Sequence, residues 1–305
     1  PTAAALPRVS VALYEDPSAR LRVIGVTGTN GKTTVTYLLE GILAAAGRTP
    51  AVVGTIEYRV GGKPLRKGLT TPFPHELQRV MAESAASGAT DLVMEVSSHS
   101  AAQGRVEGVR FDVGIFTNLT RDHLDFHGDM ESYFAAKARL FREFLPAGGK
   151  RTGIALNGDD AYGERLAQEF PSATIFGFSR SWDVHPLEME MRWEGTRMVI
   201  STPSGVLSLR SRLIGAHNVS NILAAVSAAL LLGLSPEAVA EGIGAVDAVP
   251  GRLEPVPNAR GLHVYVDYAH TPDGMDRVLT TLLGLTEGRL ITVFGCGGNR
   301  DRGKR

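Results

Sequence analysis

The sequence predicts an α/β protein, with a mostly parallel sheet covered by helices, one antiparallel section and the start of a second α/β domain. Three observations support this. Short apolar runs alternate with stretches of helical spacing over the first half of the chain. Between Glu188 and Leu213 the pattern changes to shorter alternating runs around turns. Strand and helix patterns then resume after the break at Pro250-Gly251.

The first predicted strand and helix flank a glycine-rich loop. Residues 22–26 are apolar, and residues 32–46 have helical spacing that ends at Gly47, a typical helix stop. The alternation continues with predicted strands at 51–56, 91–96 and 113–116 and predicted helices at 75–87 and 131–145. Repeated strand and helix units of this kind indicate parallel strands covered by helices.

The second half of the chain begins with the antiparallel section. Its predicted strands include 198–201 and 206–209, and a helix at about 218–232 follows. After Pro250-Gly251 we expect a strand at 264–267, a helix after Pro272 and a strand at 290–294. The sequence therefore predicts a lead-in or linker at 1–20, a central domain at 21–248 and an incomplete, Rossmann-like second domain at 249–305.

Composition limits the classes of function. Thirty-two basic residues balance thirty-two acidic ones, so the net charge favours neither nucleic acid nor a membrane as partner, and any anion site is local. The single cysteine, Cys296, excludes an internal disulfide framework and fits a cytoplasmic protein. The most apolar stretch, 222–234, is shorter than the ~20 residues that span a bilayer, and the first twenty residues do not resemble a signal peptide.

The strongest chemical signal is the loop Gly25-Val-Thr-Gly-Thr-Asn-Gly-Lys-Thr-Thr34. Its glycines allow the backbone to approach phosphate, Lys32 supplies a charge for the outer phosphates, and the Thr33 hydroxyl is placed to bind magnesium. Val26 stands where the usual pattern has its first glycine. A plain glycine turn is the alternative, but Gly-Lys-Thr-Thr directly after a strand favours a P-loop nucleotide site.

This loop resembles that of the Mur ligase and folylpolyglutamate synthetase superfamily, whose members use ATP to join an amino acid to a carboxylate. Further motifs resemble the branch of the Mur ligase family that adds the third amino acid to a UDP-linked muramoyl-dipeptide. These motifs are Thr70-Thr-Pro72, Met94-Glu-Val-Ser-Ser-His99, Gln103-Gly-Arg-Val-Glu-Gly108, Asn118-Leu-Thr-Arg-Asp-His-Leu-Asp-Phe-His-Gly128, Gly215-Ala-His-Asn218, Gly251-Arg-Leu-Glu254, Asp267-Tyr-Ala-His-Thr-Pro-Asp273 and Gly295-Cys-Gly-Gly-Asn-Arg-Asp-Arg-Gly-Lys-Arg305.

The resemblance assigns catalytic and metal-binding roles. It makes Lys32 a phosphate-binding residue and Thr33 and Glu95 magnesium ligands, and it places His123 at a second magnesium. His123 and His127 are four residues apart, a spacing that can place both on one helix face, but a packing role is the preferred interpretation for His127. Lys137 alone suggests a lysine whose stem lies on apolar material. The resemblance instead implies that its amine reacts with carbon dioxide to give a carbamate ligand, N6-carboxylysine.

The resemblance also implies three sets of substrate contacts. The ATP-binding set is Gly28, Thr29, Asn30, Gly31, Lys32, Thr33, Thr34, Asn218, Arg252, Asp267, Tyr268 and His270. The set for the UDP-linked muramoyl-dipeptide is Thr70, Thr71, Ser97, Gln103 and Arg105. Arg300 matches an arginine that meets the carboxylate of the incoming amino acid. Each of these residues can instead be a cap, turn or core residue.

The expected function is therefore ATP- and Mg²⁺-dependent ligation of meso-diaminopimelate, with L-lysine or L-ornithine as alternatives, to the D-glutamate of UDP-N-acetylmuramoyl-L-alanyl-D-glutamate through an acyl phosphate. We expect a cytoplasmic monomer with small-molecule substrates. Two other interpretations stay open at this point. One is another ligase of the Mur or folylpolyglutamate type, and the other is a P-loop nucleotide switch that does not ligate.

Overall fold

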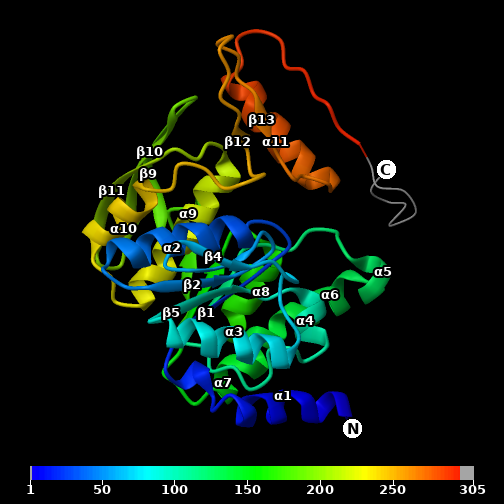
Figure 1. Ribbon diagram of the computed structural model, residues 1–305. Coiled ribbons are helices and arrows are strands. Elements are labelled where there is room, and N and C mark those ends of the chain that lie inside the picture. The colour runs from blue at the N-terminus through cyan, green and yellow to red at the C-terminus, as the bar shows by residue number, and fades with distance from the viewer. Residues whose placement is uncertain (1, 296–305) are drawn as a thin grey trace.

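An eight-stranded sheet forms the centre of the protein in its computed structural model, which describes residues 2–295 (Figure 1). Its strands, in spatial order, are β4 (Lys63–Arg66), β3 (Tyr58–Val60), β2 (Pro50–Val53), β5 (Asp91–Glu95), β1 (Arg22–Thr27), β6 (Val113–Phe116), β7 (Gly153–Asn157) and β8 (Thr174–Phe176). The six strands β2, β5, β1, β6, β7 and β8 pair in parallel with their neighbours in that order, whereas β3 and β4 form an antiparallel edge next to β2. The predicted, mostly parallel sheet is confirmed.

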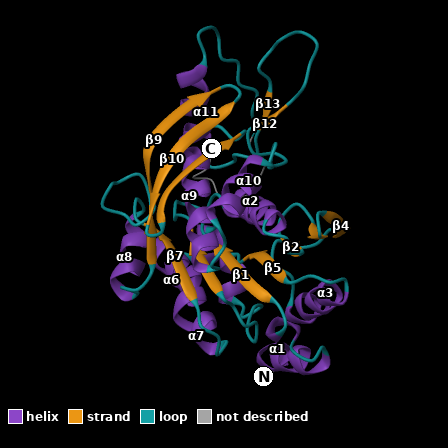
Figure 2. Ribbon diagram, turned by 90° about the vertical axis from the view of Figure 1, so that its left-hand side faces the viewer, coloured by secondary structure: helices purple, strands orange, loops and turns teal. Residues whose placement is uncertain are grey.

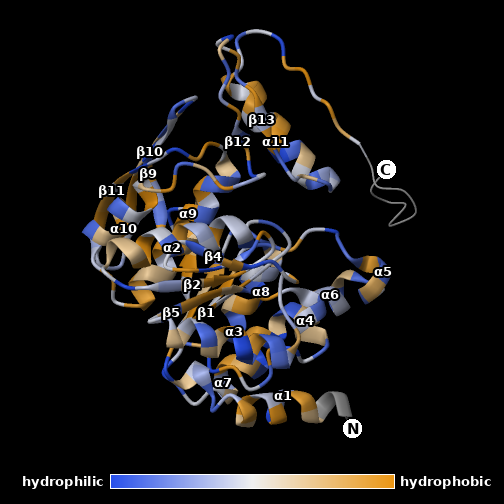
Figure 3. Cartoon of the chain, in the orientation of Figure 1, coloured by the Kyte–Doolittle hydropathy of each residue, from blue (hydrophilic) through white to orange (hydrophobic). Residues whose placement is uncertain are grey.

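Helices cover both faces of this sheet. On one face lie α2 (Lys32–Ala45), α9 (Ala216–Leu231) and α10 (Pro236–Gly244). On the other lie α3 (Pro74–Ala86), α4 (Ser98–Ala102), α6 (Met130–Arg139), a π-helical turn (Leu140–Phe144) and α7 (Leu145–Ala147). The alternation of β1 serves both faces, because Val23 joins the second core and Ile24 and Val26 join the first. Figure 3 shows the hydrophobic residues gathered on the strands between these helix layers.

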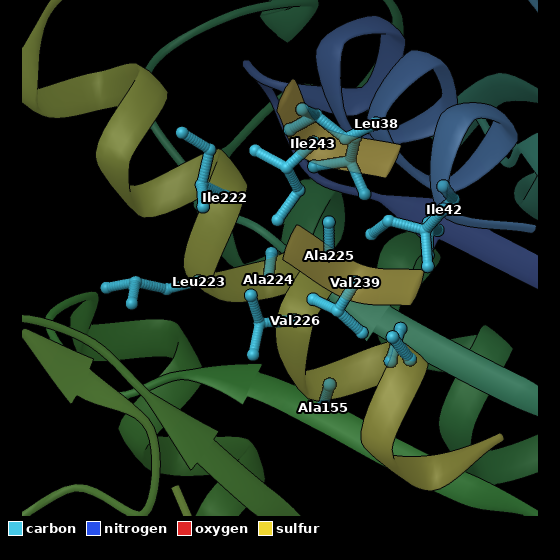
Figure 4. Close-up of a cluster of buried hydrophobic side chains, with 14 of the residues drawn as sticks. Leu38, Ile42, Ala155, Ile222, Leu223, Ala224, Ala225, Val226, Val239 and Ile243 are labelled. Atoms are coloured by element: carbon cyan, nitrogen blue, oxygen red, sulfur yellow. The ribbon is translucent and has the colours of Figure 1, made fainter. Parts of the chain in front are cut away.

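The first of these cores joins α2, α9 and α10. Leu38 and Ile42 of α2 meet Ile222 of α9 and Ile243 of α10 (Figure 4). The helices α2 and α10 approach closely, since a Cβ atom added to Gly242 would lie 2.3 Å from the Cα atom of Ile42. Glycine is therefore required at that crossing, and the helix that begins at the phosphate loop is fixed directly to α10.

The predicted antiparallel section is a separate sheet of three strands, β9 (His185–Arg192), β10 (Gly195–Thr202) and β11 (Gly205–Ser211) (Figure 2). It packs against α10. Two further elements were predicted, β13 (Tyr265–Val266) within the expected strand at 264–267 and α11 (Pro272–Leu285) after Pro272. The sequence analysis did not single out α1 (Thr2–Leu13), a 3₁₀ turn (Pro17–Ala19), α5 (Leu124–His127), α8 (Ala161–Glu169) and β12 (Glu254–Pro255). The segment expected as a lead-in thus contains a helix, which contacts α3.

The residues after Pro250 form a small unit of β12, β13 and α11, seen above the sheet in Figures 1 and 2. A cluster that includes Ile214, Leu253 and Leu282 joins it to the central part. The predicted strand at 290–294 is wrong, because no strand of the described chain pairs with it and Val293 is 94% exposed. Within residues 2–295, no helix is long and apolar enough to cross a bilayer.

Candidate active site

The phosphate loop lies between β1 and the N-terminus of α2, at the carboxyl end of the parallel strands. Gly28 has φ +144°, and a Cβ atom there would lie 1.9 Å from Thr117 Oγ1. The next residue along, Asn118, accepts a hydrogen bond from Asn30 N–H through its Oδ1 atom at 3.0 Å. The loop is therefore held in one shape, with the positive end of α2 behind it, as an anion site requires.

Two lysines converge on this loop. Lys32 Nζ donates to the carbonyl oxygens of Gly28 and Thr29, both at 2.8 Å, and Lys137 Nζ from α6 donates to the same Gly28 oxygen at 2.7 Å. Burial lowers the pKa of Lys32. The pKa of Lys137, whose side chain is 1% exposed, lies well below its ordinary value because of burial and then because of the nearby Lys32 charge. A neutral amine at Lys137 is thereby favoured.

Glu95, at the end of β5, faces the start of α2. Its Oε1 atom accepts hydrogen bonds from Thr33 Oγ1 and from the backbone N–H of Thr55, both at 2.9 Å, and its Oε2 atom accepts one from Thr55 Oγ1 at 3.0 Å. The carboxyl group is buried, and in the described chain no basic side chain lies within ion-pair distance of it. A buried carboxylate with only neutral donors fits a bound cation.

The histidines gather beside α6. His123 precedes α5 with φ 54° and His127 ends that helix, and the His99 ring centroid lies 4.9 Å from the His123 centroid and 5.5 Å from the His127 centroid. Burial lowers the pKa of His123 and of His127 to about 4, so both imidazoles are neutral at pH 7. His127 packs against Tyr133 at 5.0 Å between centroids, in keeping with a packing role. Neutral His123 keeps a nitrogen lone pair with which it can bind a metal.

The residues expected to bind the dipeptide substrate lie together, next to Glu95. Thr71 Oγ1 donates to the Glu95 backbone oxygen at 2.8 Å and lies 3.3 Å from Ser97 Oγ. Arg105 donates to the Thr71 backbone oxygen at 3.1 Å and to Gln103 Oε1 at 2.8 Å. The remaining member, Thr70, lies 3.0 Å from Thr55 Oγ1. This polar cluster adjoins the phosphate loop through Glu95.

The unit after Pro250 contributes to the same site from the opposite side. Arg252 Nη2 donates to Thr33 Oγ1 at 3.4 Å, and its guanidinium lies 5.0 Å from the centre of the Tyr268 ring. His270 Nε2 lies 3.9 Å from Asp122 Oδ2, near the loop. Asp267 accepts from the backbone N–H groups of Leu253 and Ala269, so in this structure it orders the chain around it.

Asn218 does not face the phosphate loop. Its Nδ2 atom donates to the Ile214 carbonyl oxygen at 2.8 Å, and its Oδ1 atom accepts from Asn221 at 3.2 Å. Asn221 is the residue beside the loop, since a Cβ atom on Gly31 would lie 2.2 Å from Asn221 Oδ1. The sequence analysis missed Asn221 and Thr55. Arg300, expected at the incoming amino acid, lies outside the described residues.

Within residues 2–295, no three side chains of His, Cys, Asp or Glu come together as a metal site of protein ligands alone. A metal at Thr33 and Glu95 would thus take part of its coordination from nucleotide oxygens or water, as Mg²⁺ does in phosphoryl-transfer sites. Two open hollows of about 430 and 620 Å³ lie elsewhere, one between α2 and residues 245–248 and one between β9–β11 and α10.

Comparison with protein families decides the relationship. The Mur ligase middle domain matches residues 26–229, and the Mur ligase glutamate ligase domain matches residues 251–305. The chain belongs to the Mur ligase family. Members of this family are ATP-dependent ligases that form an amide bond.

Similar Mur ligases are known from several bacteria. The UDP-N-acetylmuramoyl-L-alanyl-D-glutamate–2,6-diaminopimelate ligases of Geobacter metallireducens and Gloeobacter violaceus are 50% and 46% identical to this chain over 99% and 98% of its length. The chain spans 60% of the length of each. A solved ligase of the same name has a TM-score of 0.79 and 33% identity, with 99% of this chain and 62% of the other covered.

A Mycobacterium tuberculosis folylpolyglutamate synthase complexed with ADP and AMPPCP shares the fold. Its TM-score is 0.75 at 21% identity, with 92% of this chain and 70% of the other covered.

Proposed function

We propose that this chain is the catalytic part of an ATP-dependent ligase that adds 2,6-diaminopimelate, in its meso form, to the D-glutamate of UDP-N-acetylmuramoyl-L-alanyl-D-glutamate. The observation that carries the proposal is that Glu95 joins two clusters, since it contacts Thr33 of the phosphate loop and Thr71 of the dipeptide cluster. The names of the similar ligases favour diaminopimelate over L-lysine or L-ornithine.

The proposed reaction needs no protein nucleophile. The D-glutamate carboxylate attacks the γ-phosphorus of ATP, ADP leaves, and the acyl phosphate that forms is attacked by the amine of the incoming amino acid. The amine loses its proton and the tetrahedral intermediate releases phosphate. The protein supplies position and charge. In this proposal residues Gly28 to Thr34, the N-terminus of α2 and Lys32 bind the phosphates, and the dipeptide cluster (Thr70, Thr71, Ser97, Gln103 and Arg105) holds the acceptor.

Mg²⁺ is part of the proposal. Thr33 and Glu95 would hold one ion, and His123 and the modified Lys137 a second. These ions would neutralise charge that develops on the transferred phosphoryl group. The neutral Lys137 amine would add to carbon dioxide, forming an N–C bond and releasing one proton, and so replace a cation by an anionic oxygen ligand. Its burial and its pKa, well below the ordinary value, support this modification.

Residues after Pro250 complete the nucleotide site in this proposal. Arg252, Tyr268 and His270 would contact the nucleotide directly. Asp267 would act by ordering the backbone around it. Asn218 would act through its hydrogen bond with Asn221. Arg300 is proposed to meet the carboxylate of the incoming amino acid.

We propose the parts 1–20, 21–248 and 249–305 as lead-in, central domain and second domain. We propose a monomer that acts in the cytoplasm, where its co-substrate ATP is available.

The test is phosphate release by the full-length gene product with ATP, Mg²⁺ and UDP-N-acetylmuramoyl-L-alanyl-D-glutamate. Meso-diaminopimelate, L-lysine and L-ornithine are added in separate reactions. Release that requires the dipeptide and only meso-diaminopimelate is expected. Release that is indifferent to the dipeptide would instead identify a nucleotide switch, and dependence on a different acceptor would identify another ligase of the superfamily.

A further inference from the structure

The turn after β2, which includes Gly54 and Thr55, contacts the Glu95 carboxylate. Thr55 uses both its backbone N–H and its hydroxyl, one to each carboxylate oxygen, at 2.9 and 3.0 Å. Two donors from one residue fix both the position and the rotation of a carboxylate. The third donor, Thr33, is itself a candidate metal ligand, so Thr55 is the residue dedicated to holding Glu95.

Gly54 leaves the space that this arrangement needs. A Cβ atom at position 54 would lie 2.6 Å from Glu95 Oε1 and 3.3 Å from its Cδ atom. The carboxylate is buried and held by three hydrogen bonds, so it has no alternative position nearby that keeps these bonds. A side chain at Gly54 would therefore displace the carboxylate rather than be accommodated.

Thr55 also connects Glu95 to the dipeptide cluster. Its single hydroxyl proton is donated to Glu95 Oε2, so in the 3.0 Å contact with Thr70 the Thr70 hydroxyl must be the donor. The lone pairs of Thr70 are then left as acceptors for a substrate N–H or O–H group. The orientation of the Thr70 hydroxyl, proposed to bind substrate, thus depends on the position of Glu95.

We propose that Thr55 is a positioning residue that orients Glu95 toward Mg²⁺ and Thr70 toward the acceptor substrate, with Gly54 providing the room. This inference rests on the proposed function. It predicts that Thr55 and Gly54 matter for the magnesium-dependent part of nucleotide binding, although within the described residues the hydrogen bonds of Thr55 with side chains go to Glu95 and Thr70 and not to the phosphate loop.

The experiment compares Thr55→Val, Thr55→Ser and Gly54→Ala with the unchanged full-length gene product. The affinity for a non-hydrolysable ATP analogue is measured by calorimetry, once with excess Mg²⁺ and once with EDTA. Thr55 is exposed, so its replacement leaves the protein folded, and Thr174→Val on the far edge strand β8 is the matched control.

Thr55→Val is expected to lose about tenfold of the Mg²⁺-dependent gain in affinity, in line with a hydrogen bond to a charged group, while affinity in EDTA is unchanged. Thr55→Ser should restore the gain, and Gly54→Ala should lose more of it than Thr55→Val. The KM for the dipeptide substrate should rise in Thr55→Val and stay unchanged in Thr174→Val.

An unchanged Mg²⁺-dependent gain in Thr55→Val would overturn the inference and leave the ATP site standing. If the unchanged protein itself showed no Mg²⁺-dependent binding, the proposed function and the inference would both fail.

Discussion

The two sides of the proposed nucleotide site differ in how firmly their residues are held. On the side of the central part, Glu95 and Lys137 are each 1% exposed, and they are hydrogen-bonded to backbone groups of Thr55 and Gly28, next to the ends of β2 and β1. On the side of the second unit, Tyr268 is 61% exposed and Arg252 reaches Thr33 only at 3.4 Å. The groups proposed for phosphoryl transfer are therefore preorganised within the central part, whereas the other proposed contacts depend on how the second unit is placed.

The largest effect on ligation is expected from a substitution on the central side of the site. Lys137→Ala should lower ligation by about 10³-fold, the upper range for removal of one preorganised charged group. Formate or acetate should restore part of the activity, because each can supply the lost carbamate oxygens, whereas methylamine should not. Ligation rates with each additive test this, with the exposed Lys63→Ala as control. Rescue by methylamine alone would show that the lysine acts as an ammonium group.

The second prediction compares the two sides directly. Lys32→Met removes a cation held by two loop carbonyls and should weaken ligation by about 10²- to 10³-fold. Arg252→Met removes a longer contact, at 3.4 Å, and should cost about tenfold. Values of kcat/KM for ATP provide the measurement. Equal losses would mean that the second unit is as firmly placed as the phosphate loop.

The third prediction concerns the backbone that supports the central side. Gly28→Ala should destabilise the protein by about 3 kcal/mol, because its Cβ atom would overlap Thr117 at a positive φ. Gly47→Ala, also at positive φ but with open space around it, should cost about 1 kcal/mol. Urea unfolding separates the two. Similar losses would place the cost in φ alone rather than in the contact.

The smallest effect is expected where the two sides meet. His217, at the start of α9, has a buried Nδ1 atom with no hydrogen-bond partner in the described chain. Burial lowers its pKa to about 4, an effect that Asp267 opposes. In the unfolded chain this imidazole binds a proton near pH 6.5, whereas in the folded protein it does so only near pH 4. The free energy of unfolding therefore falls as the pH drops through this window.

His217 alone is expected to contribute a loss of about 1–2 kcal/mol between pH 7.5 and pH 5, in addition to that from His123 and His127. His217→Gln should flatten this part of the stability curve, as measured by denaturant unfolding at several pH values. His75→Gln is the control, because that residue lies at the exposed start of α3. An unchanged slope in His217→Gln would assign the pH dependence to other groups.

The sequence predicted what depends on local pattern. The strand at 113–116, the helix after the phosphate loop and the placement of Glu95 at a strand end all follow from periodicity and glycine positions, and the structure has them there. Residues 290–294 have the same apolar pattern, but a strand also needs a neighbouring strand to pair with, which a pattern does not reveal.

Residues whose importance comes from contacts across the fold were missed. Thr55 meets Glu95 only because β2 and β5 are neighbours in the sheet. Asn218 and Asn221 are nearly one helical turn apart on α9, so the motif alone does not say which of them lies against Gly31. Choosing between them requires the direction from which α9 crosses the loop.

The close crossing of α2 and α10 at Gly242 has a mechanical consequence. The helix α2 begins at the phosphate loop and contains Thr33, and the chain reaches Arg252 eight residues after α10 ends at Gly244. The crossing of α2 and α10 therefore links the two residues of the Thr33–Arg252 contact. A methyl group added at Gly242 would push α2 and α10 apart at this crossing. The distance between Thr33 and the Arg252 guanidinium would increase, and nucleotide binding would slow. No residue proposed to contact the nucleotide would itself be changed.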